Sequence, residues 1–236
     1  MLYIKKSIIF ITMLVFIFAL ASCKKEKEKA GRINEGYIEY KMQYMGDSLE
    51  RFVQTFLPRR MKLIFRDNNT KNHISDATGL FSFTHIKNQA KGLQAILMKI
   101  MNNKYKYVEP LAEESAFFKE RPEMRINHVE DTKWIAGYSC RKAKIAYPTG
   151  KKETKHFNIY YTDEIDIKGF TRHTPFQSIN GVLMEFQLEL YQMPFRLIAT
   201  EVKRQKITDD AFTIPQDYKA VNKKTLREII EVLKER

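Results

Sequence analysis

Alternation of apolar and polar residues with a period of two dominates this chain, and this period is typical of half-buried β-strands. In the first such segment Ile38, Tyr40 and Met42 share one face, while Glu39 and Lys41 share the other. The same alternation, or a run rich in β-branched and aromatic residues, recurs along most of the chain. It predicts strands over 37–44, 61–65, 71–74, 80–86, 105–108, 124–130, 138–147, 156–161, 182–191 and 195–207.

A few segments have apolar residues at helical spacing instead. This spacing predicts helices over 47–57, 92–101 and 222–236, with a helical or irregular excursion over 111–123. Pro58 ends the first of them, and the apolar run of the second is short enough to fit a strand as well. In the last, Thr225 and Glu228 have the spacing of a capping box.

Short connections between consecutive strands predict an antiparallel meander. Because the strands alternate and helices are few, the sheet must hide one face beneath those helices or beneath a ligand. The pattern therefore predicts an α+β fold, with residues 36–236 forming a single domain that ends in an amphipathic helix.

The N-terminus has the pattern of an export signal. Lys5 and Lys6 precede an apolar run that begins at Ile8, which is short for a transmembrane span. The run ends in Leu-Ala-Ser-Cys at residues 20–23, which resembles the lipobox of bacterial lipoproteins. That resemblance implies that residues 1–22 are a signal peptide and that Cys23 carries a lipid anchor. A plain secretory signal, or an uncleaved N-terminal helix, is the alternative.

The composition is basic, with a formal net charge of +13 at pH 7. Residues 23–35 are charged and have no apolar period, so they are expected to form a flexible tether between lipid and domain. The cations are spread along the chain without a nucleic-acid motif, so no nucleic-acid partner is predicted. Acidic headgroups or glycans are natural partners of the charge, and a merely soluble basic surface is the alternative. Lys24 differs from the aspartate that retains some lipoproteins at the inner membrane, which favours the periplasmic side of the outer membrane.

Little in the sequence suggests catalysis. Once Cys23 is lipidated only Cys140 remains, and its β-rich surroundings predict a buried thiol. The five histidines lie on separate segments without metal-ligand spacing, and no Gly-rich phosphate loop is present. Cys140 with His156 is the one nucleophile and base pairing that can be constructed. We predict a protein without enzymatic activity, cofactor or metal.

Four segments resemble, in order, motifs of a group of exported bacterial domains of unknown function that is related to the GLPGLI family. The matching residues are 132–143 (IAGYKC in the group), 160–165 (WYTxEI), 180–183 (GxPl) and 207–218 (sLFxxPxGY). The chain departs from the pattern at 177–181, where relatives favour a Gly-Leu-Pro-Gly-like sequence, and at Asp217, where they favour glycine. The resemblance covers most of 36–219.

This resemblance implies a fold similar to the periplasmic lipoprotein carriers: a strongly curved antiparallel sheet, or open half-barrel, with a few helices on its concave side and an apolar cavity between them. The predicted function is therefore a membrane-anchored envelope lipoprotein that binds an apolar or lipidated ligand. The alternative is a structural or interaction lipoprotein with a self-filled core and a protein or glycan partner. Candidate cavity residues, each of which also fits ordinary core, are Tyr40, Met42, Met61, Phe65, Phe81, Phe83, Phe157, Tyr161, Met184 and Phe186.

Overall fold

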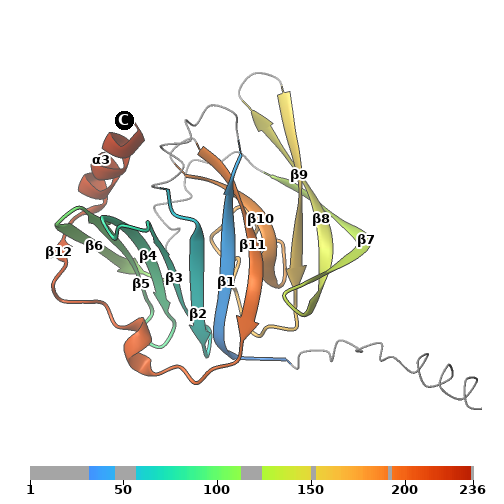
Figure 1. Ribbon diagram of the computed structural model, residues 1–236, viewed down its shortest axis with the longest axis horizontal. Helices are drawn as coiled ribbons and strands as arrows, with labels where there is room; N and C mark the ends of the chain where they lie inside the picture. Colours follow the sequence, from blue (N-terminus) through green and yellow to red (C-terminus); the bar gives the residue numbers. More distant parts are fainter. Residues whose placement is uncertain (1–31, 46–56, 113–123, 150–152, 191–192, 235–236) are drawn as a thin grey trace, which may run out of the picture.

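One unclosed β-sheet makes up most of the protein (Figure 1). The computed structural model describes residues 32–45, 57–112, 124–149, 153–190 and 193–234. Across these residues the sheet has twelve strands in the order β12-β6-β5-β4-β3-β2-β1-β11-β10-β9-β8-β7. The strands are β1 (Glu35–Tyr44), β2 (Arg60–Arg66), β3 (Asn69–Ser75), β4 (Phe81–Asn88), β5 (Leu93–Ile100), β6 (Asn103–Pro110), β7 (Arg125–Ile135), β8 (Tyr138–Thr149), β9 (Glu153–Thr162), β10 (Val182–Leu190), β11 (Met193–Lys203) and β12 (Lys219–Ala220).

Neighbouring strands are antiparallel, except that the two-residue β12 pairs in parallel with β6. The meander predicted from the short connections is thus present from β1 to β6 and from β7 to β11. Tight turns join several strands: Asp67 and Asn68 between β2 and β3, and Ala136 and Gly137 between β7 and β8, all have positive φ. Positive φ at both central residues is the type I′ geometry that suits the twist of a two-stranded hairpin.

The α+β prediction is wrong, because the fold is mostly β. The described residues contain a single α-helix, α3 (Lys223–Lys234), together with a single turn of 3-10 helix, η1 (Asp209–Phe212). The predicted helix over 92–101 is strand β5. Its central residues 94–98 are buried without interruption, so both faces of this strand are covered and the apolar pattern loses its period of two.

The C-terminal helix is confirmed, but its cap differs from the prediction. The Asn222 side-chain oxygen accepts a hydrogen bond from the Thr225 backbone N–H at 2.8 Å. Asn222 is therefore the N-cap, and Thr225 lies inside the first turn instead of starting a capping box. The buried Leu226 packs against Ile96 and Met98, so α3 covers part of the sheet face formed by β4, β5 and β6.

The two faces of the sheet are covered by different segments of the chain. On the outer face, residues 204–218 run from β11 to β12 and bury Ile207 and Phe212 against Ile86 and Leu97. The inner face carries the large core cluster, which includes Tyr40, Phe65 and Leu197 among its members. Figure 1 shows how the sheet curves, so that β4 to β6 and β7 to β9 lie on opposite sides of β1 and β11.

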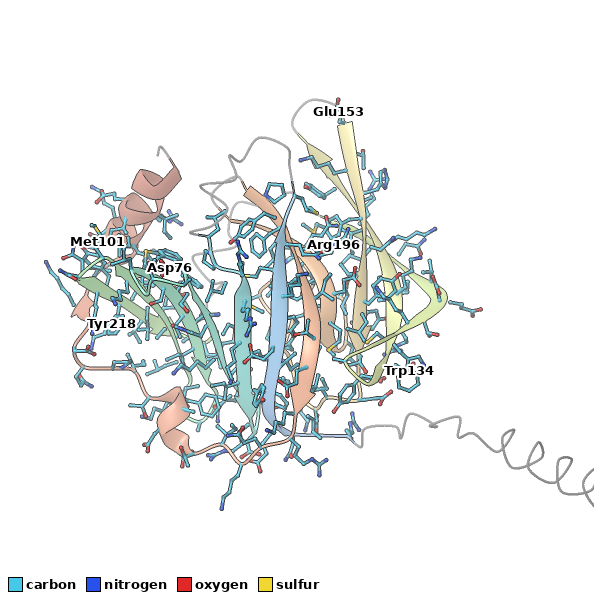
Figure 2. All side chains as sticks on the ribbon, viewed as in Figure 1. Asp76, Met101, Trp134, Glu153, Arg196 and Tyr218 are labelled. Carbon is cyan, nitrogen blue, oxygen red and sulfur yellow. The ribbon has the colours of Figure 1, made fainter. Side chains whose placement is uncertain are left out.

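Several sequence predictions fall outside the described residues. These are the signal peptide 1–22, the lipidated Cys23, most of the tether 23–35, nearly all of the helix 47–57 and most of the excursion 111–123. Within the described residues, no helix is both long and apolar enough to cross a bilayer. The chain enters β1 at one end of the sheet. The turn between β7 and β8, next to the half-exposed Trp134, lies at the same end (Figure 2).

Candidate ligand-binding hollow

The connection between β9 and β10 lies on the inner face of the sheet. Residues 163–181 form neither helix nor strand, and they are tied to both halves of the sheet. The Lys168 backbone N–H donates to Asn68 Oδ1 at 2.7 Å, next to β3. At the other side, Phe176 is 1% exposed and stands edge-on to Phe186 of β10, with ring centroids 6.4 Å apart. We call residues 163–181 the plug segment.

An apolar hollow of about 130 Å³ remains between the plug segment and the sheet. Its wall comes from β2 to β5 on one side, from β10 and β11 on the other, and from the plug segment. The lining residues are Met61, Thr70, Asn72, Ile74, Phe83, His85, Lys87, Ile96, Phe170, Thr171, Thr174, Phe176, Leu183, Phe186, Leu188 and Phe195. An apolar protein cavity of about 150 Å³ can hold one benzene-sized molecule. The hollow is therefore large enough for one small ring or a short alkyl segment.

Three of the ten residues predicted to line a cavity do line this hollow: Met61, Phe83 and Phe186. The other seven do not. Among them Tyr40, Phe65 and Met184 are fully buried in the core, which is the ordinary role that the sequence also allowed. The seven are Tyr40, Met42, Phe65, Phe81, Phe157, Tyr161 and Met184.

Hydrogen bonds and ring contacts account for most of the aromatic residues outside the hollow. The Tyr40 hydroxyl donates to the Leu183 carbonyl at 2.9 Å, and burial raises the pKa of this phenol. The Tyr161 hydroxyl lies 2.8 Å from His128 Nδ1. Phe157 packs edge-on to Tyr147. The Tyr40 bond links β1 to β10 across the middle of the sheet, whereas the other two contacts join strands within the β7 to β9 half.

A second depression, of about 670 Å³, lies along the end of β1 that leads out of the sheet. Tyr40 and Met42 contribute to its wall from the inner face, whereas Glu39 and Lys41 contribute from the outer face. Because both faces of one strand line it, this depression is a notch in the molecular surface, and the sheet does not enclose it.

Polarity changes in a regular way along the hollow. Strand register places side chains of the inner face in transverse rows. The row nearest the start of β1 is polar across its middle, and it consists of Gly36, Phe65, Thr70, Lys87, Gln94 and Glu109. The row four residues further along β1 is apolar, and it consists of Tyr40, Met61, Ile74, Phe83, Met98 and Tyr105. The hollow thus has a polar end and an apolar end.

Two basic side chains of β4 belong to the polar side. His85 Nε2 lies 3.2 Å from Gln94 Oε1, and burial, with a smaller effect of the Lys87 charge, lowers the pKa of this imidazole to about 4. Burial and then the charge of Arg172 lower the pKa of Lys87 to about 8. Lys87 is therefore charged at neutral pH and His85 is neutral.

The lowered pKa of His85 makes stability depend on pH. The unfolded chain takes up a proton near pH 6.5, which the folded protein binds only near pH 4. The contribution of His85 to the free energy of unfolding is therefore fully present above about pH 6.5. It decreases by up to about 3 kcal/mol as the pH drops to 4. We expect His85→Gln to flatten this portion of the profile, measured by urea unfolding, whereas His156→Gln, at an exposed position of β9, leaves it in place. An unchanged slope in His85→Gln would contradict this origin.

The buried thiol predicted from the sequence is confirmed. Cys140 is 0% exposed, and burial raises its pKa to about 12, which is opposite to what a nucleophile needs. His156 pairs with Ala146, six residues along β8 from Cys140, so the two side chains lie roughly 20 Å apart. The Cys140–His156 pair is thus not assembled. Across the described residues, no group of three or more His, Cys, Asp or Glu side chains is arranged to hold a metal ion.

Sequence reasoning missed the plug segment, because no element is predicted between the strands 156–161 and 182–191. A signal was present. The connection is long for a compact domain and contains Ile165, Ile167, Phe170, Phe176 and Ile179 without a helical or strand period. Long connections that bury apolar side chains are uncommon and are often functional. The polar lining by Lys87 and His85 was also missed, because alternation alone does not separate a polar cavity wall from a solvated face.

Comparison with known proteins adds no family. No model of a protein family matches the chain, and no curated protein is significantly similar to it. The resemblance of its segments to the GLPGLI-related domains therefore stays a prediction.

Proposed function

We propose that this protein is a membrane-anchored envelope lipoprotein without enzymatic activity, which binds a small apolar group between the plug segment and the sheet. Attachment through Cys23 and a location facing the periplasm at the outer membrane belong to this proposal. The observation that carries it is the hollow itself, which is walled by Phe83, Phe176 and Phe186 and is of a size for one ring or a short alkyl segment.

Packing around the hollow supports binding over simple core formation. Apolar side chains that stay in contact with water forgo the free energy that their full burial would supply. A hollow of about 130 Å³ that is partly open to solvent leaves the apolar lining beneath the plug segment in this position, which is unfavourable for a purely structural core. An apolar guest offsets that cost by restoring the missing contacts.

Filling the hollow tests the proposal. Leu188 of β10 lines it, so Leu188→Trp is expected to place an indole there and exclude a guest. The probe is hexanamide, and the measurement is the rise in melting temperature of the full-length protein in lipid nanodiscs as the probe is added. We expect a saturable rise in the unaltered protein and none in Leu188→Trp. The matched control is Leu80→Trp, at a half-exposed position outside the hollow, which keeps the rise.

The second candidate, a structural or interaction lipoprotein with a self-filled core, is favoured by the small volume of the hollow. Ligand pockets for drug-sized molecules are usually about 300 to 1,000 Å³, so this hollow does not hold a whole diacyl lipid in the conformation described. If neither hexanamide nor hexanoate, the carboxylate of the same chain length, raises the melting temperature of the unaltered protein, the second candidate replaces the first.

A further inference from the structure

At the polar end of the hollow stands a lysine that has no carboxylate partner among the described residues. Lys87 projects from the inner face of β4, in the row that also holds Thr70 and Gln94. None of the ion pairs found among the described residues involves Lys87, for which pairing would need a carboxylate oxygen within 4.0 Å. Its ammonium donates a hydrogen bond to the Arg172 backbone carbonyl at 3.4 Å, which is a long contact to a neutral acceptor.

The acid in the same row is already engaged elsewhere. Glu109 of β6 is 4% exposed and lies two strands away from Lys87. Its Oε2 accepts from the Tyr107 hydroxyl at 3.0 Å and lies 3.6 Å from the Lys223 ammonium of α3. The α3 helix therefore supplies the cation for Glu109, and this carboxylate does not neutralise Lys87.

Positive charge consequently accumulates where the hollow is polar. The charge of Arg172, on the plug segment, is one of the causes that lower the pKa of Lys87, which means that the two cations repel each other. His85, the other titratable group of β4 at this end, is neutral at pH 7. A cation held in a partly dry site without an opposite charge costs stability, and an anion that reaches it relieves the cost.

We infer that the hollow selects an amphipathic anion, a small carboxylate whose apolar group lies among Phe83, Phe176 and Phe186 and whose charged end pairs with Lys87. This inference rests on the proposed function and adds the chemical class of the guest. The direction is set by the two rows described above, because the apolar row forms one end of the hollow and the Lys87 row the other. A charge-assisted hydrogen bond to a partly buried ammonium supplies the selectivity.

Two probes of the same shape and different charge test the inference. Hexanoate and hexanamide share the pentyl chain, and only hexanoate carries a negative charge at pH 7. Dissociation constants are obtained from the rise in melting temperature of the full-length protein in lipid nanodiscs against probe concentration. We expect hexanoate to bind about tenfold or more tightly than hexanamide, and Lys87→Met to remove this preference while hexanamide still binds.

The matched control removes a lysine from the opposite face. Lys71 lies on the neighbouring strand β3 and pairs with Ile86. The Ile86 side chain belongs to the outer cluster, which is the group formed by Ile207, Phe212, Ile86 and Leu97 on the outer face. Lys71→Met is expected to keep the preference for hexanoate, because its charge lies on the other side of the sheet. Equal binding of the two probes to the unaltered protein, or a preference that survives in Lys87→Met, overturns the inference. Binding of neither probe overturns the proposed function instead.

Discussion

Cys23→Ala is expected to abolish the incorporation of radiolabelled palmitate into this protein and to leave residues 1–22 attached to the chain. In the proposed function the thiol of Cys23, the last of the lipobox-like residues 20–23, is acylated, and the chain is then cleaved before Cys23. The two forms are separated by metabolic labelling and by the mass of the intact chain. The effect is all or none, because alanine offers no sulfur to carry the lipid.

The physical consequence of the anchor follows from the number of acyl chains. One chain of myristoyl length binds a bilayer reversibly, with an association constant of about 10⁴ M⁻¹, whereas two or more hold firmly because each buried methylene contributes about 0.8 kcal/mol. The chain also offers a matched control, since its one other cysteine, Cys140, is fully buried. Cys140→Ser is expected to keep the label. Label that persists in Cys23→Ala and disappears in Cys140→Ser would show that the lipobox interpretation is wrong.

Phe176→Ala is expected to destabilise the protein by about 3 to 5 kcal/mol and to let the hollow accept a longer guest. The side chain is 1% exposed and joins the plug segment to the sheet through its edge-on contact with Phe186. Truncating a buried phenylalanine loses its transfer free energy and leaves a cavity of roughly the volume of a ring. For a chain of this size such a loss lowers the melting temperature by roughly 10 °C.

Binding separates this effect from a simple loss of packing. Decanamide has four methylenes more than hexanamide, and we expect it to bind Phe176→Ala about tenfold or more tightly than the unaltered protein, because the enlarged hollow buries the longer chain. Phe212→Ala is the matched control: this ring is 2% exposed in the outer cluster and does not line the hollow. It is expected to cost similar stability and to leave decanamide binding unchanged. Equal gains in both variants would assign the effect to general loosening of the fold.

Most of the sheet could be predicted from the sequence because its strands have one covered face and one face that is more open. Along β1 the residues Ile38, Tyr40 and Met42 are buried while Lys41 and Gln43 are exposed, which is the pattern that a period of two reports. The hairpin between β2 and β3 could be predicted for a similar local reason. Asp67 and Asn68 adopt the positive φ that their side chains tolerate better than most.

Prediction failed where the pattern depended on distant segments of the chain. Strand β5 is covered on the inner face by α3 and on the outer face by residues 207–214, and neither partner is adjacent in sequence. Ala95 and Ile96 therefore point to opposite faces and are both buried. The candidate site failed for the same reason: Met61, Phe83 and Phe186 meet only because the plug segment folds back onto the sheet, which no local period encodes.

The polar end of the hollow, where Lys87 lies, is on the same side of the domain as the start of β1. Gly36 and Lys87 belong to the same transverse row of the inner face. The chain enters the domain at that side, so the anchor proposed at Cys23 precedes this end of the sheet in the sequence. A small fatty acid bound as inferred, with its carboxylate at Lys87, would therefore have its charged group on the side where the chain enters β1 and its apolar group further from that side.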